Sequence, residues 1–297
     1  MNSAHYKRGP TTKKSDLQSA ALLRPITVLL FIVRCLMLYR SFRYLCLIFC
    51  LPCLASNVFA QTTHAAVASN FSHAAKEIFA AFEGATGHKV KASYASTGKL
   101  FAQIKYGAPY HVFLAADTQT AERTELEGLS LPGSHFTYAK GTLALWYPSY
   151  QASLQSSAQH STLTLATLPS LSGSRLALAK SKLAPYGRAA EQVLSQLEKE
   201  GISFKKVFGQ SVSQAFQFVA TGSSKLGLVA VSQLIAYDAP PSSWLTIPKH
   251  YYEPIAQQAV LLNKGNGHIA AIVLFEYLQQ AQAREIILRY GYTLDSH

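Results

Sequence analysis

The segment Ser96-Thr97-Gly98-Lys99 has the residue types and the spacing of a reactive site. A serine three residues before a lysine fits the S-x-x-K signature of serine acyl-enzymes, in which the lysine helps to activate the serine. The same residues also fit a turn from a strand into a helix, where free backbone N–H groups bind an anion. The segment alone leaves both a nucleophile and an anion site open.

The rest of the chain lacks the partners that a serine acyl-enzyme needs. There is no S-x-N or K-T-G motif, and Lys140-Gly141-Thr142 has the letters of the second motif in the wrong order. The hydrolase motif G-x-S-x-G and the zinc motif H-E-x-x-H are also absent. We therefore predict no catalytic residue, and the S-x-x-K acyl-enzyme remains a distant alternative.

Uncharged polar residues precede four predicted helices. They lie at 69–70, 97–98, 184–187 and 211–212, and they offer hydroxyl and amide groups with hardly a charge among them. Such donors at helix N-termini suit a small, desolvated oxyanion that is held by directed hydrogen bonds. Serine, threonine and asparagine are also common as simple helix caps, so each position by itself has a structural explanation.

Short apolar runs alternate with segments of helical periodicity along most of the chain. The predicted strands are 64–68, 88–94, 110–115, 142–147, 175–180, 226–231 and 257–262. This order predicts an α/β fold with largely parallel sheets, in which the helix starts lie at the carboxyl ends of the strands.

Two polar or proline-rich stretches divide this pattern, at 148–162 and 237–254. If both are crossings between lobes, lobe one contains residues 61–147 plus 250–297. Lobe two then contains residues 148–249, and a ligand cleft lies between the lobes.

Residues 1–60 have the layout of an N-terminal extension and a secretory signal, which we expect to be removed. Two arginines, Arg40 and Arg43, precede an apolar stretch that ends in small residues, and cleavage is expected near Ala60. Translation from Met37 would give a signal of ordinary length, so the start at Met1 or Met37 stays open. A membrane anchor within 22–57 is the alternative, but arginines interrupt the apolar run before it reaches roughly 18 residues.

The removable segment also changes the charge and the cysteine count. It contains all 4 cysteines, so the predicted mature chain has no disulfide and no cysteine metal site. It holds 8 of the 27 lysines and arginines and 1 of the 15 acidic residues, which leaves a net charge of +5 on residues 61–297. No basic cluster with interleaved aromatic residues occurs, so we expect no nucleic-acid partner.

Several segments in order resemble the periplasmic molybdate-binding proteins of ABC transporters. These are AAVASNFSHAAKEIFAAFEGATGHKV, YASTGKLFAQIKYGAPYHVFLAAD, KLAPYGRAAEQVL, VSQAFQFVATGSSKLGLVAVSQ and ILRYGYTL, which together span residues 63–294. The resemblance implies a periplasmic binding protein type II fold, with two α/β lobes that close on molybdate or tungstate. It also implies delivery of the oxyanion to ABC transporter membrane subunits by a monomer in the periplasm.

The resemblance places the ligand-binding residues by position in the family's motifs. They are Ser69, Asn70, Ser96, Thr97, Tyr186 and Val212, the last through its backbone N–H. The metal would be bound as its oxyanion, so no residue is expected as a direct metal ligand, and no cofactor is expected.

Two positions depart from the family's pattern. Many members have a tyrosine where this chain has Ala230, and we expect Tyr186 to supply the missing donor from another loop. His111 replaces an aspartate, and we expect it to be a packing or surface residue. Sulfate, thiosulfate, chromate and phosphate remain alternative ligands, although a site with donors only disfavours hydrogen phosphate, whose proton would be unpaired.

Overall fold

A computed structural model describes residues 33–34, 36–37, 60–150 and 163–295. Residues Met1–Phe59 and Ala60–His297 form two separate units, and the second contains both sheets of the fold. The predicted signal lies almost wholly outside the described residues, as do its cysteines and most of the stretch 148–162. Within the described part of the chain, no helix combines the length and the apolar character needed to cross a membrane.

The first sheet has the strand order β2-β1-β3-β10-β4 within the described residues. Its strands are β1 (Thr62–Ala68), β2 (Lys89–Ala95), β3 (Val112–Ala115), β4 (Ser130–Gly141) and β10 (Ile255–Leu262). The expected parallel pairing is present between β1 and its neighbours β2 and β3. The sheet is nevertheless mixed, because β10 runs antiparallel to β3 and β4.

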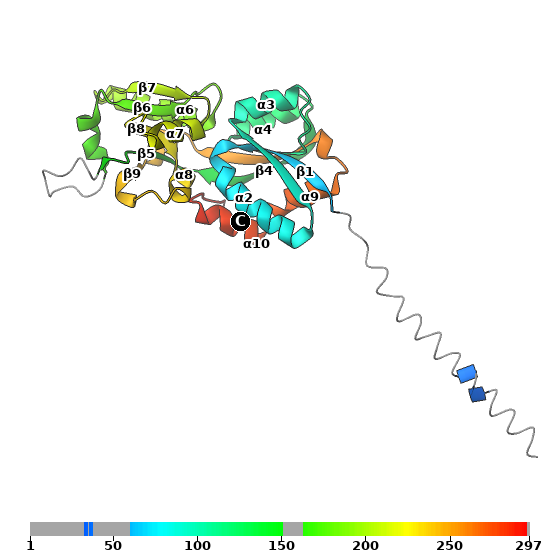
Figure 1. Cartoon of the computed structure of the whole chain (residues 1–297). Helices are drawn as coiled ribbons and strands as arrows, with labels where there is room; N and C mark the ends of the chain where they lie inside the picture. Colours follow the sequence, from blue (N-terminus) through cyan, green and yellow to red (C-terminus); the bar gives the residue numbers. More distant parts are fainter. Residues whose placement is uncertain (1–32, 35, 38–59, 151–162, 296–297) are drawn as a thin grey trace, which may run out of the picture. The chain divides into compact units, whose positions relative to one another are not determined.

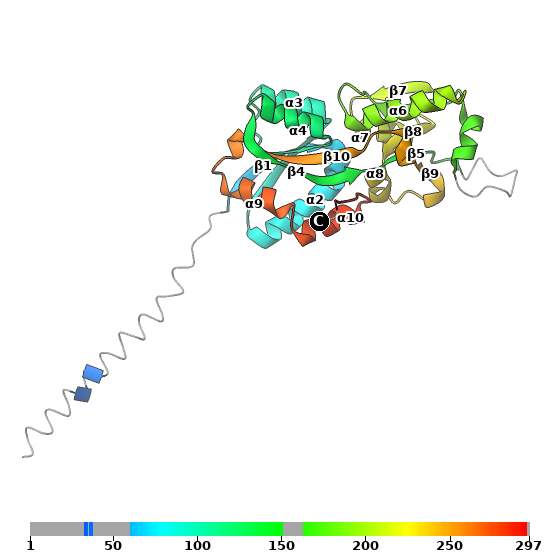
Figure 2. The ribbon, with the colours of Figure 1, turned by 180° about the vertical axis from the view of Figure 1, so that it is seen from behind.

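Helices cover both faces of the first sheet (Figures 1 and 2). Helices α2 (Ser72–Thr86), α9 (Ile269–Tyr277) and α10 (Ala281–Arg289) pack on one face, and α3 (Thr97–Lys105) and α4 (Thr118–Leu126) pack on the other. Successive residues of a strand point to opposite faces, so Val112 and Leu114 join the α2 side while Phe113 joins the α3 side. A strand buried on both faces explains the continuous apolar run in the sequence.

The second sheet has the order β7-β6-β8-β5-β9 within the described residues. Its strands are β5 (Leu143–Trp146), β6 (Arg175–Ala179), β7 (Lys205–Gly209), β8 (Leu226–Ala230) and β9 (Trp244–Thr246). Strand β6 pairs in parallel with β7 and β8, and β5 runs antiparallel to β8 and β9. Both sheets therefore have three parallel strands on one side, including an edge strand, and an antiparallel neighbour on the other.

The second sheet is also covered on both faces. Helix α6 (Pro185–Lys199) packs on one face, and α7 (Val212–Ala220) and α8 (Val231–Ala236) pack on the other (Figure 1). The shorter 3-10 segments are η2 (Ser69–Phe71), η3 (Leu165–Leu171), η4 (Pro241–Ser243), η5 (Lys249–Tyr251) and η6 (Asn263–Gly265). Two sheets with their own helices form the two-lobe α/β fold that the sequence predicts.

The first crossing between the lobes differs from the predicted one. Strand β5 pairs with β8 and β9 in the second sheet, so the chain leaves lobe one at residues 141–142, before the stretch 148–162. The prediction assigned 142–147 to lobe one, because a short buried apolar strand has the same pattern in either sheet. The chain returns to lobe one at β10. Tyr252, which precedes β10, still packs in the hydrophobic core of lobe two that α6 covers.

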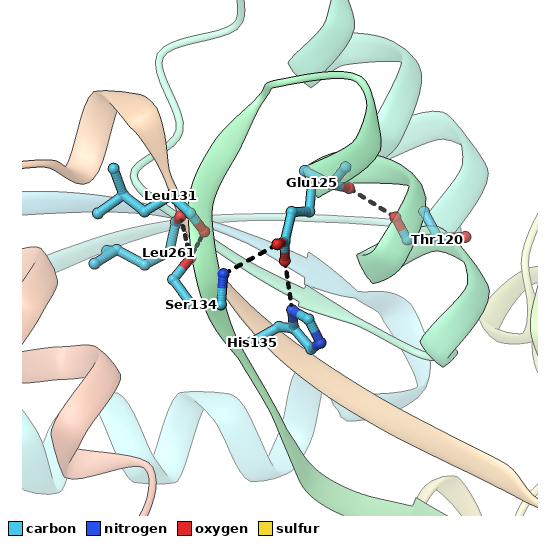
Figure 3. A network of polar contacts seen from close by, with 8 residues as sticks. Thr120, Glu125, Leu131, Ser134, His135 and Leu261 are labelled. Atoms are coloured by element: carbon cyan, nitrogen blue, oxygen red, sulfur yellow. Dashed lines mark hydrogen bonds and ion pairs between the residues drawn. The ribbon is translucent and has the colours of Figure 1, made fainter.

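A polar network fixes the start of the long strand β4 against helix α4 (Figure 3). The Glu125 carboxylate accepts a hydrogen bond from Gly133 N at 3.1 Å and lies 2.9 Å from His135 Nδ1. Ser134 Oγ donates to the carbonyl groups of Leu131 and Leu261 at 2.6 and 3.0 Å. These contacts tie α4, β4 and β10 together at the end of β4 that is remote from the crossing.

Candidate functional site

The predicted binding segments lie at the carboxyl ends of parallel strands. In lobe one, β1 ends at Ala68 beside Ala95 of β2, so the two following loops start next to each other. In lobe two, β6 ends at Ala179 beside Gly209 of β7, with the same result. Parallel pairing therefore brings the four predicted helix starts to two neighbouring loop pairs, one in each lobe.

Direct contacts join these loop pairs across the lobes. Gly98 N at the start of α3 donates to Leu183 O, which precedes α6, at 3.0 Å. Ser213 Oγ in the first turn of α7 donates to Ser69 O at 3.1 Å. Ser232 Oγ in the first turn of α8 donates to Asn70 O at 3.0 Å. The lobes are thus closed on each other around the predicted site residues.

Two serines at helix starts have opposite roles. Ser211 is the N-cap of α7, and its hydroxyl accepts a hydrogen bond from Gln214 N at 3.2 Å. Ser96 occupies the same position before α3, but its side chain makes no cap bond. The Ser96 hydroxyl is buried and has no hydrogen-bond partner among the described residues. Helix capping therefore explains Ser211 and leaves Ser96 unexplained.

Thr97 and Val212 are the first residues of α3 and α7, and both are buried. Thr97 Oγ1 accepts a hydrogen bond from Ala116 N at 3.1 Å, which leaves the hydroxyl proton available for a further acceptor. The first N–H groups of a helix have no partner inside it, and they point along the positive end of the helix dipole. Both residues can therefore offer donors to an anion.

The Asn70 side chain does not face the site as a free donor. Its Nδ2 donates to Gln257 Oε1 at 2.8 Å and to Tyr292 OH at 3.2 Å, so both amide protons are engaged. The Tyr292 hydroxyl also bonds to Asn70 O and Ser232 Oγ, each at 2.9 Å. In this arrangement Asn70 can reach an anion through its backbone N–H.

Tyr186 is in the first turn of α6, and its side chain is only 2 % exposed. Its hydroxyl has no hydrogen-bond partner among the described residues. Burial raises the pKa of Tyr186 well above its ordinary value, and the nearby hydroxyls of Tyr292, Tyr252 and Tyr138 raise it further. The phenol therefore stays protonated and can act only as a neutral donor or acceptor.

The carboxylate of Asp117 lies near these helix starts and is paired. Asp117 is buried at the N-cap of α4, where Oδ1 accepts from Thr120 N at 2.9 Å and Oδ2 binds the guanidinium of Arg188 on α6. This ion pair links the lobes and neutralises a charge that would repel an anion. No group of three or more potential metal ligands occurs within the described ranges.

The serine acyl-enzyme alternative lacks its central contact. Lys99 is exposed, and the unpartnered Ser96 hydroxyl makes no hydrogen bond to it. An open groove lined by Ser96, Ser213 and Gln217 borders the site. The geometry thus presents isolated donors on both lobes and no pair of a nucleophile and its base.

Comparisons with known proteins match most of this chain to one protein family. Residues 63–293 match the family described as bacterial extracellular solute-binding protein. The molybdate-binding protein ModA of Azotobacter vinelandii is 44% identical over 81% of this chain and 93% of its own length. That of Rhodobacter capsulatus is 39% identical over 82% of this chain and 91% of its own length.

This chain belongs to the ModA family of bacterial extracellular solute-binding proteins. A solved structure of the periplasmic molybdate-binding protein of Azotobacter vinelandii aligns with a TM-score of 0.67 and 33% identity. The alignment covers 79% of this chain and 100% of that one. The resemblance and the two-lobe fold predicted from the sequence are therefore confirmed.

Sequence patterns did not identify the polar residues that surround the predicted site residues in the fold. They are Tyr138, Ser213, Ser232, Gln257 and Tyr292, all of which bond to the predicted residues or to one another. One signal was available, because Gln257 and Gln258 interrupt an otherwise apolar strand, and Gln257 is fully buried. Ala230 is buried at the start of α8 and offers no side-chain donor, as expected.

Proposed function

We propose that this protein is a periplasmic receptor that binds one molybdate or tungstate dianion per chain and delivers it to ABC transporter membrane subunits. One observation carries the proposal. Helix starts without charged side chains come together from both lobes, and two buried hydroxyls there, those of Ser96 and Tyr186, have no hydrogen-bond partner among the described residues. Family membership with proteins named for molybdate binding supports the same ligand.

The proposed donors are all neutral. Hydroxyl groups come from Ser69, Ser96, Thr97 and Tyr186, and backbone N–H groups come from Asn70 and Val212. A buried dianion that accepts directed hydrogen bonds keeps its charge without a cationic partner, because each charge-assisted bond contributes about 1.5–3 kcal/mol.

Selectivity among oxyanions in this site depends on whether the anion carries a proton and on the size of the anion. Hydrogen phosphate carries a proton that needs an acceptor, and the nearby acceptors Gln257 Oε1 and Asn70 O are already bonded. Sulfate, thiosulfate and chromate lack that proton, so only the dimensions of the closed site separate them from molybdate and tungstate.

Binding and release require the lobes to move, because donors from separate lobes can reach one ion only when the cleft is closed. The contacts of Gly98 with Leu183 and of Asp117 with Arg188 would stabilise the closed form. Small-angle scattering should show a smaller radius of gyration after molybdate is added. An unchanged profile would argue for a site that is preformed in the free protein.

The proposal assigns no catalytic step and no cofactor to the chain, which would act as a monomer without nucleic acid. Residues 1–60 would direct export and be cleaved near Ala60. Sequencing the N-terminus of the exported protein tests the cleavage site, and a start far from Gln61 would contradict it.

Calorimetric titration of the exported protein with molybdate, tungstate, sulfate and phosphate is the direct test. We expect tight binding of molybdate and tungstate with one site per chain, weaker binding of sulfate and none of phosphate. Absence of heat and of a thermal shift with molybdate would refute the proposal. Preference for sulfate, thiosulfate or chromate would identify a different oxyanion receptor.

A further inference from the structure

Gln257 places a primary amide inside the strand β10, where its side chain is fully buried. Its Oε1 accepts two hydrogen bonds, from Asn70 Nδ2 at 2.8 Å and from Tyr138 OH at 3.1 Å. Both lone pairs of this oxygen are therefore used, and the two donors fix which end of the amide is the oxygen. A flipped amide would place two N–H groups against two donors.

The other end of the amide faces Tyr186. A Cβ atom added to Gly141 would lie 2.8 Å from Gln257 Nε2 and 2.1 Å from Tyr186 OH, so both atoms border the same small space. Neither atom has a hydrogen-bond partner among the described residues. The glycine at the lobe crossing is what allows these two side chains to approach each other.

The chemistry of the pair sets the direction of a proton. Nε2 carries only donors, so a hydrogen bond between the two groups must run from Nε2 to the phenol oxygen. The Tyr186 hydroxyl proton then points away from Gln257 and is free for another acceptor. When the oxygen of a hydroxyl accepts a hydrogen bond, the hydrogen bond that the same hydroxyl donates also becomes stronger.

We propose that Gln257 is a positioning residue for the oxyanion site: when the anion binds, Gln257 Nε2 donates to Tyr186 and thereby directs the Tyr186 proton to the bound anion. The inference rests on the proposed function, because the acceptor of that proton is the oxyanion. Gln257 also holds the Asn70 side chain, so one buried amide coordinates donors from η2 and α6. It does not touch the anion itself.

Gln257→Glu tests the direction of the proton, because it preserves the shape and replaces the Nε2 donor with an acceptor. At alkaline pH the introduced carboxylate should draw the Tyr186 proton away from the anion and weaken molybdate binding by about 100-fold or more. At lower pH the introduced carboxyl is protonated, can again donate to Tyr186, and should restore much of the affinity. Gln196→Glu makes the same chemical change on the exposed surface of α6 and should bind like the parent at every pH.

A double-mutant cycle separates this role from simple charge repulsion. In a Tyr186→Phe background, Gln257→Glu should weaken binding at least about tenfold less than in the parent, because no proton remains to be redirected. Repulsion or general structural damage would give the same loss in both backgrounds. If Gln257→Glu does not fold, Gln257→Met replaces it in the same cycle, since it removes the donor without adding a charge.

The experiments distinguish failure of the Gln257 positioning role from failure of the proposed molybdate-binding function. If the parent binds molybdate but Gln257→Glu has the same affinity between pH 6 and 9, or if the cycle shows no coupling, the positioning role is overturned. If the parent itself does not bind molybdate, the proposed function fails first.

Discussion

Two polar networks of lobe one differ in how completely their hydrogen bonds are formed. The Glu125 network of α4 and β4 is about one-third exposed, and its carboxylate, hydroxyl and ring groups bond to one another or to backbone (Figure 3). The Gln257 network is buried, yet it borders the unpartnered Gln257 Nε2 and Tyr186 OH. A buried polar group without a partner destabilises the fold by about 1–3 kcal/mol, so its presence at the proposed site supports the role that we propose for it.

The two networks therefore differ in which buried polar atoms are left without partners, although Ser130 Oγ at the start of β4 is also buried and unpartnered among the described residues. The complete network ties α4 to β4 at a distance from the lobe crossing. The incomplete one lies at the crossing, where Gly141, β10 and α6 meet. Variants of these networks and of the helix starts should therefore affect stability and molybdate affinity separately.

Among changes to the proposed anion donors, Tyr186→Phe should have the largest effect, because it removes an unpartnered buried hydroxyl and keeps the ring. We expect molybdate affinity to fall about 30- to 100-fold, more than for any single serine change, while the melting temperature of the ligand-free protein is unchanged or raised. Calorimetry and thermal unfolding measure the two quantities. Equal affinity of variant and parent, combined with tighter binding by Ala230→Tyr, would mean that Tyr186 does not replace the missing donor.

Ser96→Ala and Ser211→Ala form a matched pair at two helix starts. Ser96→Ala should lower molybdate affinity about tenfold without loss of stability, because its hydroxyl bonds to nothing in the described structure. Ser211→Ala should destabilise the protein by about 1 kcal/mol, because it removes the α7 cap, and should leave affinity nearly unchanged. Urea unfolding and calorimetry of both variants give the answer, and a reversed pattern would contradict the assignment of roles.

His111 lies in a polar cluster that belongs to neither network. The pKa of His111 is lowered to about 4, mainly by burial and in addition by the charges of His268, His64 and Lys264. The unfolded state therefore binds more protons between pH 6.5 and 4, so stability is present above pH 6.5 and falls as the pH drops toward 4. Solvent around the half-buried ring limits the loss to about 1 kcal/mol.

The measurement for His111 is urea unfolding of the parent and of His111→Phe at pH 7.5 and 5. The parent should lose more stability than the variant, and both should bind molybdate equally at pH 7.5. The expected location of His111 as a packing residue agrees with its hydrogen bonds to Thr63 and His64. A pH response that is the same in both proteins would assign the effect to other groups.

Glu125→Gln should have the smallest effect. The variant loses the charge on a partly exposed pair with His135 but retains an oxygen acceptor for Gly133, so we expect a loss of at most about 0.5–1 kcal/mol. Molybdate affinity should not change. An affinity loss as large as that of Ser96→Ala would show that the two networks are coupled.

The sequence predicted the buried strands with apolar runs correctly, such as β1, β3 and β8, and also the largely exposed edge strand β2. Those that it missed are β4, β7 and β9. Pro132 and Gly133 interrupt the pattern of β4, β7 begins with two exposed lysines at the sheet edge, and β9 is only 3 residues long. The sequence also did not reveal strand direction. Strand β10 runs antiparallel to β3, yet both strands show a buried apolar run of the same kind.

By itself, the sequence determined which chemical groups stand at the helix starts and that they are uncharged, because side-chain type and helical periodicity are local properties. The tertiary structure decided which of these groups are already bonded. Ser211 has its cap within three residues, whereas Asn70 meets Gln257 across 187 positions of the chain. Hydrogen bonds depend on distance in space, so only the folded arrangement separates the Ser96 and Tyr186 hydroxyls from those that serve the fold.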